Sequence, residues 1–174
     1  MSATEEAMAL LLRPVRHAAN NLSMVLSANL ESALPRMAEG ARETVQVGRA
    51  KRAAEDYDRL VRGFLALGRD ESARPATAER FLRDLLPLLA LAAGGALELE
   101  ASGSATIRVS NPSLDACLIL ACAGAAGMPP GPRPALRLDG AALTLGWAVP
   151  EEAARALADL GATVDGATIG LPTA

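Results

Sequence analysis

Hydrophobic residues in the first third of the chain recur at alternating spacings of three and four, the pattern of an amphipathic α-helix. The pattern runs over residues 11–32 and again over residues 47–68, with Pro35 and Gly40 between the two runs. We therefore predict two long helices that fold back on each other as an antiparallel hairpin. Pro14 lies inside the first helix, where its missing N–H removes a backbone hydrogen bond and favours a bend.

Each predicted helix has a second apolar stripe beside the first one. Two packed helices cannot bury two stripes each, so the hairpin needs further partners. The simplest partner is a second copy, which gives a two-fold symmetric homodimer with a four-helix bundle. These flanking stripes contain Leu12, Ala19, Leu26 and Leu30 in the first helix, and Ala53, Leu60 and Leu67 in the second.

After a polar linker at residues 69–76, short strand-like segments alternate with helical segments to the end of the chain. This alternation predicts one mixed sheet covered on one face by helices. The chain is therefore expected to be α+β, with a helical hairpin domain over 1–70 and a small α/β sandwich over 71–174. The predicted helices are 77–92, 113–126 and 150–160, and the predicted strands flank Ser102-Gly103, Asp139-Gly140 and Asp165-Gly166.

Composition narrows the expected partners. Hydrophobic residues make up 51% of the 174 positions but aromatic residues only 2%, so Leu, Ala and Val must build the core. The net charge is −3 and no long basic patch is present, which argues against nucleic acid as a partner. The first residues do not resemble a signal peptide, and the apolar runs are too short to cross a bilayer. We expect a soluble, cytoplasmic protein without a membrane partner.

Three side chains are predicted to have structural roles. Cys117 and Cys122 lie in an apolar stretch, which indicates two buried thiols in a reducing compartment. Trp147 is expected to pack between sheet and helix, with its indole N–H bonded to a backbone carbonyl.

The chain has one histidine, His17, and it lies on the first predicted helix. One imidazole cannot build a multi-histidine metal site, but it can accept a phosphoryl group or carry a proton. Asn21 follows one turn later on the same helix face. The pattern alone leaves open whether His17 is a reactive group or an ordinary solvated surface residue.

The succession of a histidine-bearing hairpin and a small α/β sandwich resembles sensor histidine kinases, over nearly the whole chain. The run His17-Ala18-Ala19-Asn20-Asn21-Leu22 resembles their phosphoacceptor box, and residues 49–67 resemble the return helix. Residues 115–129 resemble the helix that carries the asparagine box of the ATP-binding domain. Residues 153–172 resemble the last helix and closing strands.

The chain departs from the kinases where they handle ATP. Ala18 replaces the acid that follows the phosphoacceptor histidine, and apolar residues stand near Ile119 and Ala123, where kinases place the asparagine that holds Mg²⁺. The Asp-x-Gly-x-Gly motif and the later glycine-rich turn are missing. Because transfer from ATP depends on the metal, the resemblance implies a degenerate ATPase domain without a cofactor. The chain also resembles the dimeric histidine phosphotransferases of the ChpT type.

This resemblance implies a phosphorelay. A response-regulator receiver domain, loaded by an upstream hybrid histidine kinase, would dock beside the hairpin and pass its phosphoryl group to His17. A second receiver would then accept it, and Mg²⁺ would be supplied by the receivers alone. Asn21 would contact the phosphoryl group, the imidazole or a hydrolytic water, and Arg13 and Arg16 would offset negative charge.

Met24 and Ala28, further along the same face, would form an apolar patch for a receiver helix. The alternatives stay open at this point: Asn21 as a plain surface amide, the arginines as solvated charges, and Met24 as a core residue. For the whole protein the alternatives are a non-catalytic pseudokinase-like adaptor, a receiver phosphatase acting through Asn21, and a true kinase with a divergent nucleotide site.

Overall fold

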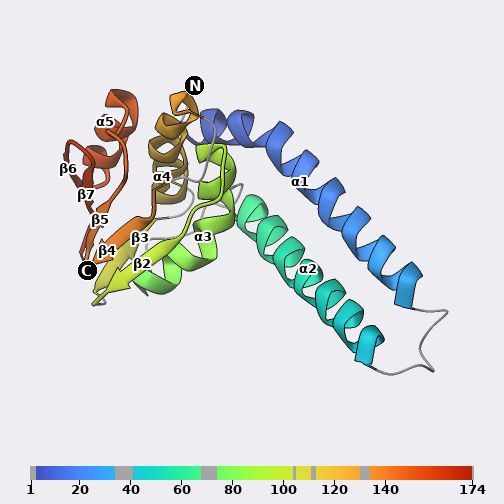
Figure 1. Cartoon of the computed structure of the whole chain (residues 1–174). Coiled ribbons are helices and arrows are strands. Elements are labelled where there is room, and N and C mark those ends of the chain that lie inside the picture. Colours follow the sequence, from blue (N-terminus) through green and yellow to red (C-terminus); the bar gives the residue numbers. More distant parts are fainter. Residues whose placement is uncertain are drawn as a thin grey trace.

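Two long helices project from a body that contains the strands (Figure 1). They are α1 (Ala3–Ala33) and α2 (Ala41–Ala66), which pack along each other. Near the far end, Nε2 of Gln46 donates a hydrogen bond to Oγ of Ser32 at 2.8 Å, which joins the start of α2 to the end of α1. The helices therefore run antiparallel, as predicted. The computed structural model describes residues 3–33, 41–67, 74–103, 105–110, 113–129 and 134–173, and the predicted turn at Pro35 and Gly40 lies outside them.

The body combines a five-stranded mixed sheet with a layer of helices. Burial alternates along its strands, so that Leu136, Leu138 and Leu143 are buried while Arg137 and Thr144 are exposed. The sheet therefore has one covered and one open face. The strand order is β2 (Leu99–Ser102), β4 (Leu136–Asp139), β5 (Ala142–Thr144), β7 (Thr168–Gly170) and β6 (Thr163–Asp165), and the helices are α3 (Ala78–Ala93), α4 (Ser113–Ala123) and α5 (Glu151–Asp159).

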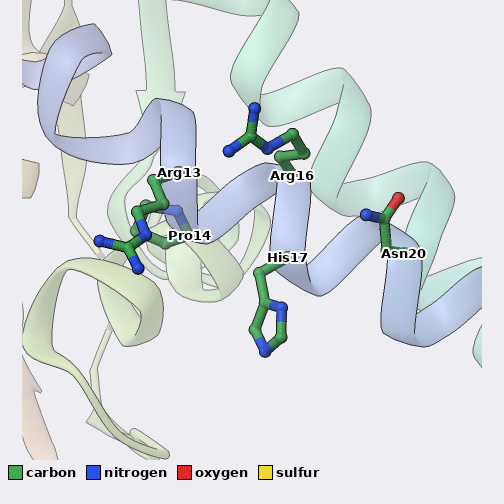
Figure 2. A pocket seen from close by; sticks show the side chains of 5 residues that line it. All are labelled: Arg13, Pro14, Arg16, His17 and Asn20. Carbon is green, nitrogen blue, oxygen red and sulfur yellow. The ribbon is translucent and has the colours of Figure 1, made fainter.

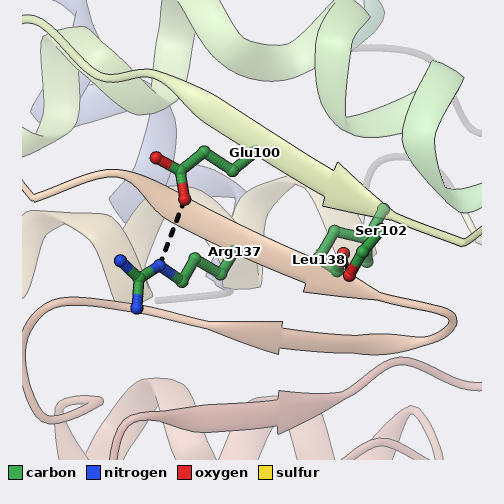
Figure 3. Close-up of polar contacts among 4 residues, drawn as sticks. All are labelled: Glu100, Ser102, Arg137 and Leu138. Atoms are coloured by element: carbon green, nitrogen blue, oxygen red, sulfur yellow. Dashed lines mark hydrogen bonds and ion pairs between the residues drawn. The ribbon is translucent and has the colours of Figure 1, made fainter.

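Strands β2 and β4 form the parallel pair of this sheet, and the other neighbouring strands are antiparallel. On the open face, Nε of Arg137 lies 3.2 Å from Oε2 of Glu100 (Figure 3). Beside this pair, Oγ of Ser102 donates to the carbonyl oxygen of Leu138 at 3.4 Å. Both contacts cross from β2 to β4 and agree with the register in which Glu100 faces Arg137.

Two strands lie outside the main sheet. Strand β1 (Arg74–Thr77) pairs antiparallel with β3 (Thr106–Val109), and the amide of Arg108 donates to the carbonyl of Pro172 at 2.7 Å. The prediction of a single sheet is therefore wrong. The predicted linker at residues 69–76 is wrong at its end, because β1 begins at Arg74. Strand β1 is mostly exposed, so it lacks the alternation of apolar residues that marks a half-buried strand.

The predicted local elements of the body are otherwise largely confirmed. Gly140 and Gly166 adopt φ of 60° and 58° in the turns that join β4 to β5 and β6 to β7, a region that glycine enters without steric cost. Helix α4 ends three residues earlier than predicted, at Ala123, and a 3₁₀ turn, η2 (Gly124–Gly127), follows. Thr77 stands at the N-cap position of α3, but its side chain makes no capping hydrogen bond.

Trp147 occupies the predicted position between helix and sheet. Its side chain is buried, and its Nε1–H donates to the carbonyl oxygen of Ala121 at 3.0 Å. Ala121 lies in the last turn of α4, where carbonyl groups lose their helical partners. The indole therefore satisfies a helix end within the core, and the prediction is confirmed.

Burial along the hairpin decreases away from the body. Ala7 and Leu11 of α1 and Leu67 after α2 are fully buried at the base, and they belong to the same hydrophobic cluster as the core of the body. Helix α1 packs here on α3 and α4 as well as on α2. In α2, the residues predicted as a flanking stripe, such as Ala53 and Leu60, are more buried than Val47 of the main stripe.

Candidate functional site

His17 lies on α1 just beyond the part of the helix that is packed into the body. Val15, two residues earlier, is buried, whereas the side chain of His17 is exposed. The ring is therefore accessible from solvent, which a nucleophile that meets a protein partner requires.

An open depression of about 370 Å³ surrounds this imidazole (Figure 2). The side chains of Arg13 and His17 point to the same side of α1, and that of Arg16 points to the other side. This arrangement follows from helix geometry, because residues four apart lie one turn apart on the same face. The described residues that line the depression are Arg13, Pro14, Arg16, His17 and Asn20.

The charged side chains that line the depression are the guanidinium groups of Arg13 and Arg16. Residues 7–30 contain Arg13 and Arg16 but no acidic residue. No carboxylate among the described residues forms an ion pair with either guanidinium group. Glu6 is about 16 Å from the imidazole along the helix axis, which is beyond the Debye length of about 8 Å at physiological salt. Along α1, the charges nearest to the imidazole are therefore the two guanidinium groups.

The other predicted site residues lie on the exposed surface of α1. Asn21 and Ala28 are exposed, and Met24 is 65% exposed, so within the chain Met24 is not a core residue. Asn21 is not among the described residues that line the depression. The structure thus brings Arg13, Arg16 and His17 together and leaves the other three on the neighbouring surface.

Pro14 and Asn20 line the depression but were not predicted as site residues. Asn20 follows His17 by three positions and Arg16 by four, so helical spacing places it near both. Which side of α1 stays open beside His17 is decided by packing and could not be predicted from that spacing. Helix α1 continues through Pro14 without interruption. The carbonyl oxygen of Leu10 therefore has no amide partner four residues on, one turn before the site.

The two thiols are unsuited to nucleophilic chemistry. Cys117 and Cys122 are buried in α4, as predicted. Burial raises the pKa of Cys117 to about 11, with a smaller contribution from Asp159, and burial raises the pKa of Cys122 to about 12. Because the thiolate is the reactive form, both side chains act as small apolar groups at neutral pH.

The region that resembles the asparagine box is packed into the core. Ile119 is fully buried and Ala123 is half-buried. In the described parts of the chain, no three or more His, Cys, Asp or Glu side chains are grouped so that they could hold a metal ion.

Among the described helices, none is both long enough and apolar enough to cross a bilayer. No protein-family model matches the chain, and no curated protein matches it either.

Proposed function

We propose that the protein relays a phosphoryl group between response-regulator receiver domains through His17 and does not use ATP. One observation carries this proposal: the only imidazole of the chain is exposed in a positively charged depression on a helical hairpin. An accessible imidazole beside two guanidinium groups suits the transfer of a dianionic group.

The proposed chemistry is an in-line exchange at phosphorus. A neutral ring nitrogen of His17 attacks the aspartyl-phosphate of the receiver, an N–P bond forms, and the O–P bond to the aspartyl carboxylate breaks. The reverse exchange loads a second receiver. Arg13, which points to the same side of α1 as the imidazole, offsets the charge of the group in transit.

The exposed apolar residues of the hairpin support the proposed homodimer. Leu12 follows the buried Leu11 and is 64% exposed, and in α2 the exposed Ala54 follows the buried Ala53. One residue corresponds to about 100° around a helix. Because the helices are antiparallel, a step of one residue toward the C-terminus turns to the same side of the hairpin in both helices. Leu12 and Ala54 therefore lie on the same side. The two exposed stripes therefore form one surface that a second hairpin can cover.

This apolar surface leaves the imidazole accessible. Leu12 and Leu30 lie at the same angle around α1, and His17 lies about 140° away from them. Leu30 is 48% exposed and Val47 of α2 is 46% exposed. A four-helix bundle formed through this surface would cover these residues and keep both copies of His17 open to receivers.

The resemblance to ATP-binding domains explains the sandwich as a body that has lost nucleotide binding. Ile119, near the position where a kinase presents its metal-binding asparagine, belongs to the hydrophobic cluster. In this proposal the sandwich serves as the base in which the hairpin is anchored, and the receivers bring Mg²⁺.

The test is a transfer assay from a labelled, phosphorylated receiver to a second receiver. The intact protein is expected to carry label on His17 and to pass it on, and His17→Ala is expected to abolish both. Thr144→Ala, an exposed residue of the open sheet face, is the matched control and should behave as the intact protein.

Four outcomes would contradict the proposal. Transfer that survives His17→Ala would exclude the relay. Loss of receiver phosphate without label on His17 would indicate a phosphatase, and receiver binding with no phosphate chemistry would indicate an adaptor. Label incorporated from ATP and Mg²⁺ without an upstream kinase would show that the sandwich still binds nucleotide.

A further inference from the structure

Asn20 lines the depression beside His17, and no role has yet been assigned to its side chain. We propose that the depression is an oxyanion subsite in which Asn20, rather than Asn21, hydrogen-bonds the phosphoryl group held on His17. This inference rests on the proposed relay and names the residue that positions the transferred group.

The chemistry of the lining residues fits an oxyanion. A carboxamide offers two N–H donors, and a guanidinium offers five. Arg13 precedes His17 by one turn, and Asn20 follows it by three residues, so the two lie on either side of the ring along the axis. The depression is open to solvent and large enough for a tetrahedral oxyanion in front of the ring.

Position around the helix distinguishes the two neighbouring amides. Arg13 lies about 40° from His17 on one side, and Asn20 lies about 60° away on that same side. Asn21 lies about 40° away on the opposite side of His17. By helical position the two arginines and Asn20 therefore lie on one side of His17, and Asn21 belongs to the adjacent surface that holds Ala28. In Figure 2 the side chain of Asn20 points to the same side of α1 as that of Arg16, so its amide must rotate to reach a group held on the ring.

The inference is tested by titrating inorganic phosphate into the full chain and following the imidazole resonances by NMR. One histidine means one set of imidazole signals, so the probe reports the site directly. At constant pH and ionic strength, phosphate is expected to shift these signals in a saturable way, whereas chloride is not. Asn20→Ala should weaken phosphate binding several-fold, and Asn21→Ala should leave it unchanged.

A second variant keeps the test decisive if Asn20→Ala perturbs the helix. Asn20→Asp has nearly the same shape but places a negative charge in the depression, so it should weaken phosphate binding more than Asn20→Ala. Arg13→Gln should also weaken it. A shift that is linear in phosphate, or equal affinities in the Asn20 and Asn21 variants, would overturn the assignment.

Relay assays on the same variants separate this inference from the function on which it rests. Asn20→Ala should slow receiver-to-receiver transfer, and His17→Ala should abolish it. Unchanged phosphate binding and transfer in Asn20→Ala would refute the subsite and leave the relay intact. Transfer that persists in His17→Ala would refute the relay itself, whatever phosphate binding shows.

Discussion

At the scale of single residues, surroundings decide which side chains can react. His17 is exposed beside cationic groups, whereas Cys117 and Cys122 are enclosed by the core. A buried thiol resists ionisation because the thiolate would lose its hydration. The same folded environment that suppresses thiol chemistry also links these two residues to the stability of the protein at high pH.

We expect the free energy of unfolding to fall as the pH rises above about 9. The unfolded thiols ionise near their ordinary pKa of 9.0, whereas the folded ones hold their protons to about 11 and about 12. Between these values only the unfolded state loses protons, so it is stabilised. At one pH unit above the ordinary pKa, the effect is about 1.4 kcal/mol for each thiol.

Urea denaturation at about pH 8 and about pH 10 measures this loss. The free energy of unfolding of the double variant Cys117→Ala/Cys122→Ala should fall less between the two pH values than that of the intact protein. The two proteins are compared by this fall, and not by their stability at either pH. An equal fall in the variant and the intact protein would contradict the assignment to the thiols.

At the scale of elements, periodicity predicted helices and turns well but did not predict strand partners. The stripes over 11–32 and 47–68 correspond to α1 and α2, and two Asp-Gly pairs form the turns of β4–β5 and β6–β7. Strand β1 was missed because its pairing with β3 depends on backbone hydrogen bonds. A backbone offers these whatever the side-chain pattern, so polarity alone did not reveal the strand.

Pro14 provides a test of how α1 is built. Pro14→Ala should raise the free energy of unfolding by about 1–3 kcal/mol, because alanine restores the amide donor for the carbonyl of Leu10. Thermal or urea denaturation measures the change. Pro87→Ala inside α3 is the matched control, since it is also a half-buried proline in a helix. A lower stability in Pro14→Ala would show that the proline ring is required by its surroundings.

At the scale of the whole molecule, the base of the hairpin and the body share one hydrophobic core. Leu11 of α1 is fully buried in the cluster that also contains Trp147. Residues so connected are expected to unfold together in a cooperative transition.

Leu11→Ala should therefore destabilise the body as well as the hairpin. Removing a fully buried leucine side chain costs about 2–5 kcal/mol. Trp147, the only tryptophan, reports the body by fluorescence, and far-UV circular dichroism reports all helices. Both midpoints should fall together, and a fluorescence midpoint that stays unchanged would show that the hairpin unfolds independently.

The proposed homodimer is also a property of the whole molecule. Leu12→Glu combined with Leu30→Glu should convert a dimer into a monomer, because both charges would be buried in the bundle. Analytical ultracentrifugation measures the result. Met24→Glu makes the same type of change about 120° away around α1 and should leave the dimer intact. A monomeric intact protein would exclude the bundle.

The linear pattern of residues was enough to predict the helical hairpin, the Asp-Gly turns, the buried cysteines and the bond of Trp147, because each depends on local spacing or on polarity. The folded chain alone showed the pairing of β1 with β3, the burial of Leu11 in the body, and the place of Asn20 beside His17. These features depend on contacts between distant segments, or on which side of a helix remains open after packing. Local periodicity contains neither kind of information.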